Sequence, residues 1–150
     1  STHHYTLKTN IEKFEVGTPS IISIVSLYYA LEYRNSIGGY TRWWEYEKEL
    51  INYTLTKCLT LSDKIKCINV NQENRIGIFT FLLPEDSLKT INQLNEKLNK
   101  QEICTRVGGH CAYPLANYLK ISTPTLRLSL YIYNTKQDID KFFQTIKEFL

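Results

Sequence analysis

The hydrophobic pattern divides the chain into a helical first part and a mixed second part. Residues 20–37 are apolar on nearly every side and are followed by Gly38 and Gly39, which predicts a helix that ends there. Residues 40–61 carry aromatic and aliphatic side chains at helical spacing, which predicts a second, amphipathic helix. A helix that is apolar on most sides belongs inside a larger assembly, so we expect these helices to pack against a surface outside this chain or a twin subunit.

From residue 65 the apolar spacing shortens, and predicted strands alternate with predicted helices. We expect strands at 65–70, 76–83, 103–107 and 126–133, with a turn at 71–74. We expect a helix opened by 84–87, one helical turn at 114–118 and a closing amphipathic helix at 135–150. This order predicts an antiparallel sheet covered by helices, an α/β domain of the α+β two-layer kind.

The organisation along the chain follows from the same pattern. The polar start, with alternation over His4–Lys8, predicts a strand or hook followed by a connector. We divide the chain into a connector at 1–19, a helical linker segment at 20–62 and a small α/β domain at 63–150.

Composition and charge argue against several functional classes. The chain has 150 residues, and its 18 basic and 15 acidic side chains give a dispersed net charge of +3, too mild to predict nucleic-acid binding. The most apolar stretch, Ile21–Leu31, is too short to cross a bilayer, and no signal peptide is visible. We therefore expect a soluble protein. Because the chain has no methionine and opens with Ser1, we expect a piece of something longer or a processed product.

Cysteine and histidine positions give little support for a metal site. The four cysteines are Cys58, Cys67, Cys104 and Cys111. None forms a Cys-x-x-Cys pair, and a chain of this size does not need disulfides, so we expect free thiols in a reducing compartment. His3 and His4 are adjacent and would face opposite ways on a strand, so we expect surface residues and no metal.

The loop over residues 106–112 is the strongest candidate for chemistry. It places Cys111 beside His110, after two glycines that allow a sharp turn, with Arg106 on the approach. A thiol acts as a nucleophile only as thiolate, which nearby cations favour, and it must be accessible. This pattern favours a reactive cysteine. A buried, inert cysteine after a turn is the alternative, and from these residues alone the two interpretations are balanced.

Three separated motifs together resemble one family. They are Phe14–Pro19, Arg106–Pro114 and Arg127–Thr135. Their order and spacing resemble the C-terminal part of a cysteine desulfurase, a class V, fold-type I enzyme dependent on pyridoxal phosphate. The short arginine-glycine-histidine-cysteine-alanine loop is similar to that of the SUF-type (group II) branch. The resemblance covers essentially the whole chain, and it implies the C-terminal small domain of a fold-type I enzyme for residues 63–150.

The resemblance also implies roles for individual residues. Cys111 resembles the nucleophile that takes sulfur from substrate L-cysteine, leaving alanine and a persulfide. Arg127 resembles the residue that holds the substrate α-carboxylate, a task suited to a planar cation; a surface arginine ending a loop is the alternative. Arg106 and His110 match substrate-side positions whose exact roles stay open.

The resemblance implies that the connector at 1–19 contains the loop that binds the cofactor phosphate. Thr18 resembles a residue that reaches across a dimer to the phosphate of pyridoxal phosphate, with the Gly17 backbone approaching closely. Helix capping is the other interpretation for Thr18. The family's cofactor lysine, which follows a histidine, has no counterpart here, because the chain contains no His-Lys dipeptide. We therefore expect this chain alone to be inactive.

The implied partners are a homodimer mate and a sulfur acceptor of the SufE or SufU kind in iron–sulfur cluster assembly. We expect the cytoplasm, or a plastid-like organelle in a eukaryote, and no membrane or nucleic-acid partner. A selenocysteine lyase or another class V enzyme is one alternative. A non-catalytic remnant that binds a sulfur-transfer partner is the other.

Overall fold

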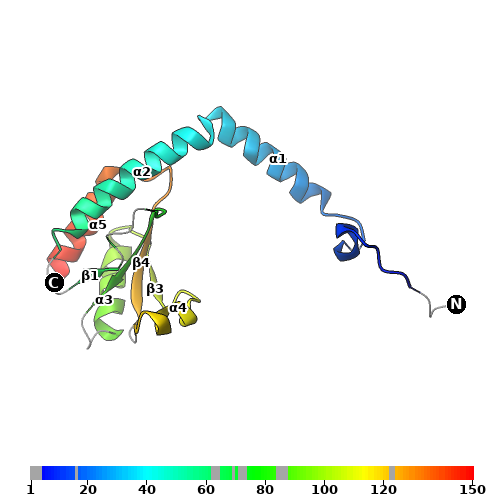
Figure 1. Ribbon diagram of the computed structural model, residues 1–150. Helices are drawn as coiled ribbons and strands as arrows, with labels where there is room; N and C mark the ends of the chain where they lie inside the picture. Colours follow the sequence, from blue (N-terminus) through cyan, green and yellow to red (C-terminus); the bar gives the residue numbers. More distant parts are fainter. Residues whose placement is uncertain are drawn as a thin grey trace. The chain divides into compact units, whose positions relative to one another are not determined.

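The computed structural model describes residues 5–15, 17–61, 65–68, 70, 74–83, 88–121 and 124–150. The chain forms two compact units, Ser1–Thr41 and Arg42–Leu150, and each is described by itself (Figure 1). His3, His4 and Val16 lie outside the described residues, as do parts of the predicted turn at 71–74 and the predicted helix start at 84–87.

The first unit is built from helices that bury nothing of their own. A 3-10 turn, η1, spans Ile11–Phe14, and helix α1 spans Ile21–Ser36, close to the predicted 20–37. None of the described residues in these two elements is buried. Ile22 of α1 is 82% exposed and even the least exposed large apolar side chain, Leu31, is 42% exposed. The apolar surface of α1 is therefore uncovered on every side.

The second unit contains a four-stranded antiparallel sheet (Figure 1). Its strands are β1 (Lys66–Cys67), β2 (Ile78–Leu82), β3 (Arg106–Gly108) and β4 (Thr125–Ser129). They lie in the order β1-β2-β4-β3, so β4 is central and pairs with both β2 and β3. The crossover from β2 to β3 passes through helix α3 (Leu88–Lys100), and the short helix α4 (Tyr113–Tyr118) leads from β3 into β4.

One face of the sheet forms the core. Alternate residues of β2 and β4 point to this face, and helices α3 and α5 (Lys136–Phe149) cover it. The aromatic centre of this layer is Phe81, whose ring lies 5.4 Å from that of Phe142 and 6.2 Å from that of Phe143. Helix α2 (Gly39–Cys58) adds Leu50 and Ile51. Because all these side chains are nearly inaccessible, the second unit has a complete core of its own.

The other face of the sheet is covered only in part, by helix α4. The strand residues that alternate with the core-facing ones point to this face, among them Ile78, Thr80 and Arg127. Leu115 and Leu119 of the α4 region lie on the same face. The two-layer sheet therefore keeps one surface available for a site.

Polar contacts join α2 to α5 and to Gly77, the residue before β2. The Tyr53 hydroxyl donates a hydrogen bond to Asp140 of α5 at 2.7 Å, and Lys57 forms an ion pair with the same carboxylate. The backbone N–H of Gly77 donates to Glu47 of α2 at 2.8 Å. A Cβ at Gly77 would stand 3.1 Å from that carboxylate and from the Leu130 carbonyl, so the close approach requires glycine.

The predicted fold class is confirmed: the second unit is an antiparallel sheet packed against helices. The strand predictions were wrong at their ends: the strand expected at 65–70 is only Lys66–Cys67, and the one expected at 76–83 is Ile78–Leu82. The strand expected at 126–133 stops at Ser129, because Tyr131 and Asn134 close a turn by accepting and donating hydrogen bonds to each other. The strand expected at 103–107 begins at Arg106, because Ile103 still bonds to Leu98 at the end of α3.

The start of the chain also differs from its prediction. Residues 5–8, the described part of the expected strand or hook, form no regular element. Each helix within the described ranges is too short or too polar to cross a lipid bilayer. The division of the chain at 19 and 62 stays a prediction.

Candidate active site

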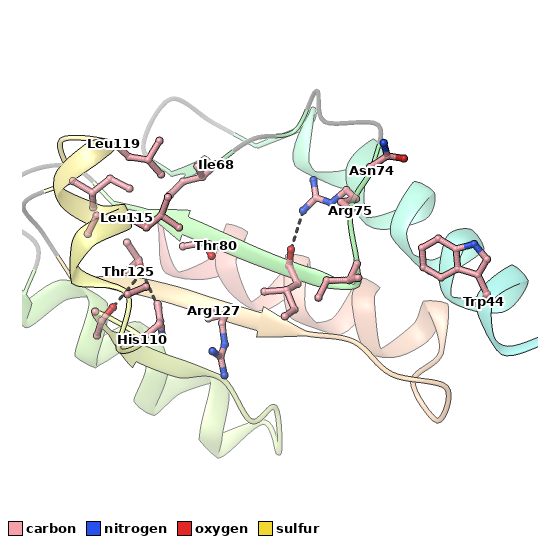
Figure 2. Close-up of a pocket in the computed structure, with 17 residues that line it drawn as sticks. Trp44, Ile68, Asn74, Arg75, Thr80, His110, Leu115, Leu119, Thr125 and Arg127 are labelled. Atoms are coloured by element: carbon pink, nitrogen blue, oxygen red, sulfur yellow. Dashed lines mark hydrogen bonds between the residues drawn. The ribbon is translucent and has the colours of Figure 1, made fainter. Parts of the chain in front are cut away.

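The open face of the sheet holds a pocket of about 660 Å3. Its wall is apolar where the α4 region approaches the sheet, through Leu115, Leu119 and Ile68 (Figure 2). Its polar lining includes three strand and loop residues that the figure also labels, namely His110, Thr125 and Arg127. None of the described residues that line the pocket is a lysine, aspartate or glutamate. The pocket therefore combines an apolar wall with arginine side chains and no acidic ones, which suits a small anion.

Arg127 owes its position to the register of the central strand. In the sheet it lies opposite Thr80 of β2 on one side and Arg106 of β3 on the other. Its Nε is buried and has no hydrogen-bond partner among the described residues. Two cations side by side on one sheet face repel each other, and an anion between them removes that cost. A carboxylate matches the planar guanidinium fork, so this pair can bind a carboxylate.

His110 is held in one orientation by a short chain of hydrogen bonds. The Thr125 hydroxyl donates to the Gly108 carbonyl at 3.2 Å, so its oxygen accepts from His110 Nε2 at 2.7 Å (Figure 2). This arrangement leaves His110 Nδ1 as a buried acceptor without a partner among the described residues. Burial lowers the pKa of His110, and the positive charges of Arg127 and Arg106 lower it further. The site thus holds a neutral imidazole.

Cys111 lies beside this pocket, on the loop between β3 and α4. Its thiol is exposed, and a guanidinium nitrogen of Arg106 donates to its Sγ at 3.8 Å. His110 and Cys111 both adopt left-handed backbone angles, with φ of 53° and 57°, which are uncommon outside glycine. The Ala112 N–H donates to the Gly109 carbonyl and closes the turn. The loop therefore folds back to bring the sulfur to Arg106.

The structure brings together four of the residues that the sequence singled out: Cys111, Arg106, His110 and Arg127. Gly17 and Thr18 belong to the first unit, where Gly17 has a φ of +83° and Thr18 is exposed. Open space surrounds a Cβ built on Gly17, so its backbone angle is the feature that calls for glycine. The roles expected for all six residues stay predictions.

Sequence reasoning missed Thr125, which fixes His110. Thr125 and Arg127 are two positions apart on β4, and alternate residues of a strand share a face. The alternation could have placed Thr125 on the same face as Arg127, but its hydrogen bond with His110 depends on the pairing of β3 with β4. Trp44 and Arg75 also line the pocket, and they come from segments whose approach depends on the tertiary fold.

The pocket as described does not form a complete site for pyridoxal phosphate. That cofactor is held by a Schiff-base lysine and by an acidic or basic partner for its ring nitrogen. The described lining has no lysine and no carboxylate, so the residues present fit a substrate carboxylate and not the cofactor ring. Among the described residues no group of three histidine, cysteine or acidic side chains could hold a metal ion.

Comparison with known proteins defines the class. The aminotransferase class-V family matches residues 1–142, and the chain belongs to this family. It is similar to proteins described as "Probable cysteine desulfurase" from Staphylococcus epidermidis and Staphylococcus aureus, each 34% identical over 140 residues. Those matches cover 91% of this chain and 32% of each relative, so the chain spans about a third of their length.

Solved structures give the same assignment. The apo structure of a cysteine desulfurase from Thermococcus onnurineus NA1 matches with a TM-score of 0.80 and 27% identity, over 99% of this chain and 36% of that one. The cysteine desulfurase CsdA of Escherichia coli matches in fold, with a TM-score of 0.77 and 22% identity, over 99% of this chain and 35% of that one. The chain thus belongs to the class-V aminotransferase family, which depends on pyridoxal phosphate, and resembles cysteine desulfurases in sequence and fold.

Proposed function

We propose that this chain is the C-terminal part of a SUF-type cysteine desulfurase and that Cys111 accepts the sulfur of L-cysteine. One observation carries the proposal: an exposed thiol lies 3.8 Å from the Arg106 guanidinium, beside a pocket in which Arg127 leaves Nε without a partner among the described residues. A sulfur nucleophile and a carboxylate-binding group are the two functions that desulfuration of an amino acid requires of this part of the protein.

Each residue has a defined task in this proposal. Arg127 binds the substrate α-carboxylate and so orients the substrate sulfur towards the loop. The Cys111 thiolate attacks that sulfur, a new S–S bond forms, and the C–S bond breaks with its electron pair left on carbon, which takes a proton to give alanine. Neutral His110 keeps the loop in place through Thr125. In this proposal pyridoxal phosphate is held by residues outside the described pocket, because the lining of that pocket has no lysine.

The proposal includes partners outside this chain. The persulfide on Cys111 would pass to an acceptor of the SufE or SufU kind for iron–sulfur cluster assembly, in the cytoplasm or a plastid-like organelle. Gly17 and Thr18 would meet the cofactor phosphate across a homodimer. The likeness to cysteine desulfurases supports these assignments.

The test is steady-state alanine formation by the complete protein that contains this segment. We expect Cys111→Ser to abolish desulfuration of L-cysteine. Arg127→Gln should lower kcat/KM for cysteine roughly 10- to 150-fold, since a hydrogen bond to a charged group contributes about 1.5–3 kcal/mol. Arg42→Gln, a change at an exposed arginine of α2, is the matched control and should have no effect. Unchanged cysteine turnover by Cys111→Ser would overturn the proposal.

A further inference from the structure

The two buried cysteines have no task in the proposed function, and they lie together in the core. Cys58 is the last residue of α2 and Cys67 is the last residue of β1. They are 8% and 6% exposed, within one hydrophobic cluster. We propose that Cys58 and Cys67 form a redox-active dithiol, which a hydroperoxide converts into a disulfide between α2 and β1. This modification site is separate from Cys111 and goes beyond the proposed function.

A short chain of hydrogen bonds joins the two thiols. The Cys58 S–H donates a hydrogen bond to the Cys67 sulfur. Cys67 Sγ in turn donates to the carbonyl oxygen of Ile68 at 3.8 Å. Two sulfur atoms that already share a hydrogen bond need only a small shift to reach the bond length of a disulfide, about 2 Å.

The position of Cys67 in the sheet permits that shift. Strand β1 lies at the edge of the sheet and has two residues. Among the described strands it pairs only with β2, with Lys66 opposite Leu82 and Cys67 opposite Phe81. Such a short pairing opens more easily than a central strand does, so a small uncharged oxidant can reach Cys67 where a bulky thiol reagent cannot.

The electrostatic surroundings give the two thiols different roles. The hydrogen bond from Cys58 lowers the pKa of Cys67, and the positive charge of Arg75 lowers it further, against the opposing effect of burial. The same hydrogen bond, together with burial, raises the pKa of Cys58. A thiolate is the form that attacks an oxidant. Cys67 is therefore the nucleophile, and Cys58 is the thiol that resolves the oxidised product.

The oxidation is balanced by the peroxide. The Cys67 thiolate attacks one oxygen of hydrogen peroxide, the O–O bond breaks, and hydroxide leaves with its electron pair, which gives a sulfenic acid on Cys67. The Cys58 sulfur then attacks the Cys67 sulfur, the S–O bond breaks, and the S–S bond forms. The Cys58 proton leaves with the oxygen as water. The two thiols lose two electrons in total, and the peroxide is reduced to water.

The disulfide would lie next to the pocket of the candidate site. Ile68, the residue after Cys67, lines that pocket (Figure 2). A covalent link from the end of α2 to β1 would therefore fix the pocket wall at this point. In a reducing compartment the dithiol is the resting form, and a dithiol reductant restores it by thiol–disulfide exchange.

The experiment treats this chain with hydrogen peroxide and needs no cofactor. The protein is alkylated in urea without reduction, and trypsin then places the four cysteines on separate peptides, namely 58–64, 67–75, 101–106 and 107–120. We expect peptide 58–64 to be joined to 67–75, with the loss of two hydrogen atoms, and dithiothreitol to separate them.

Two variants define the route. The chain with Cys104→Ser and Cys111→Ser should form the same link, because the exposed thiols take no part in it. In Cys58→Ala the sulfenic acid that dimedone traps on 67–75 should increase about fivefold or more, because the resolving thiol is lost. Circular dichroism of each variant confirms that it is folded.

Each contrary outcome overturns the dithiol. Peptides 58–64 and 67–75 that remain separate and alkylated after peroxide show that the two thiols do not pair. A link from either of them to 101–106 or 107–120 in its place has the same meaning. Loss of the link in the chain with Cys104→Ser and Cys111→Ser shows that the exposed thiols are the site of oxidation. None of these results bears on the proposed function, which Cys111→Ser tests in the complete protein.

Discussion

At the scale of single residues, His110 is fixed more firmly than the thiol next to it. Thr125 accepts from its Nε2 at 2.7 Å, while Cys111 contacts Arg106 through one long bond of 3.8 Å. The site therefore combines an imidazole held by a short hydrogen bond with an exposed thiol held by one long contact. This combination suits a residue that must take sulfur in one position and deliver it in another.

The titration of His110 tests this electrostatic description. We expect an NMR pH titration of its ring to give a midpoint below the usual 6.5, because burial and then Arg127 and Arg106 lower its pKa. Arg127→Gln should raise the midpoint, and Arg42→Gln should leave it in place. His110→Asn identifies the resonance. A midpoint at or above 6.5, or a midpoint that Arg127→Gln leaves unchanged, would contradict this description.

The same shift sets the direction of a pH effect on folding. The folded-state pKa of His110 lies below the unfolded value of 6.5, so the unfolded state binds more protons at lower pH. Its contribution to the free energy of unfolding is complete above pH 6.5 and is lost as the pH falls through 6.5 towards the folded-state pKa. Urea titrations at several pH values should show this loss, and His110→Asn should lack it.

Thiol accessibility gives a second residue-level prediction. With a disulfide reagent, Cys104 and Cys111 should react in the native chain, because they are exposed, and Cys58 and Cys67 should react only in urea, because they are buried. Equal reaction rates for all four thiols in the native chain would contradict the burial of Cys58 and Cys67.

The sequence predicted the main residues of this site but not Thr125, the residue that holds His110 in place. Arg106, His110 and Cys111 lie within six consecutive residues, so one loop motif names them, and Arg127 stands in a motif of its own. Thr125 escaped because its role exists only once β3 and β4 pair, with Gly108 opposite Thr125. Pairing between strands is a tertiary property that no single segment displays.

At the scale of elements, the start of α5 depends on one capping box. The Thr135 hydroxyl accepts from the Asp138 N–H, and the Asp138 carboxylate accepts from the Thr135 N–H. We expect Thr135→Ala to lower the free energy of unfolding by about 1 kcal/mol in urea titrations. Thr56→Ala, at an exposed position inside α2, is the control and should change little. Equal effects would contradict the capping role.

Gly77 tests how closely α2 approaches the sheet. Gly77→Ala places a Cβ 3.1 Å from the Glu47 carboxylate and from the backbone oxygen of Leu130, which cannot move cheaply. We expect a loss of about 1–3 kcal/mol in the free energy of unfolding, as for overpacked sites. A loss no larger than that of Thr56→Ala would show that the approach is looser than described.

The elements themselves followed from local patterns, and their ends did not. Helix α3 was predictable because Ile91, Leu94 and Leu98 recur at helical spacing and are all fully buried. The end of β4 depends on the turn at Tyr131–Asn134, which the alternating Leu, Tyr and Ile residues concealed. The spacing of hydrophobic residues therefore predicts which residues are buried better than it predicts where a turn ends a strand.

At the scale of the whole molecule, the second unit has a buried hydrophobic core and the first unit has none among its described residues. Residues 42–150 enclose a core, whereas no described residue of α1 is buried. The pattern at 20–37 predicted this need for a covering surface. We infer that α1 is covered by a surface outside this chain, and a second copy of the chain can supply one when the chain is alone.

Self-association of the isolated chain tests that inference. We expect sedimentation velocity to show concentration-dependent association, which Ile22→Glu combined with Tyr29→Glu should reduce by removing exposed apolar surface. Ser26→Glu combined with Asn35→Asp adds the same charge without removing such surface and is the control. A monomer at all concentrations would contradict the account of α1.

The most direct test of the central claim is the location of sulfur after turnover. The complete protein, supplied with pyridoxal phosphate and L-cysteine, is alkylated, digested with trypsin and examined by mass spectrometry. The account predicts that the first extra sulfur atom appears on peptide 107–120, at Cys111. Alanine formation with no sulfur on that peptide at any time would contradict it.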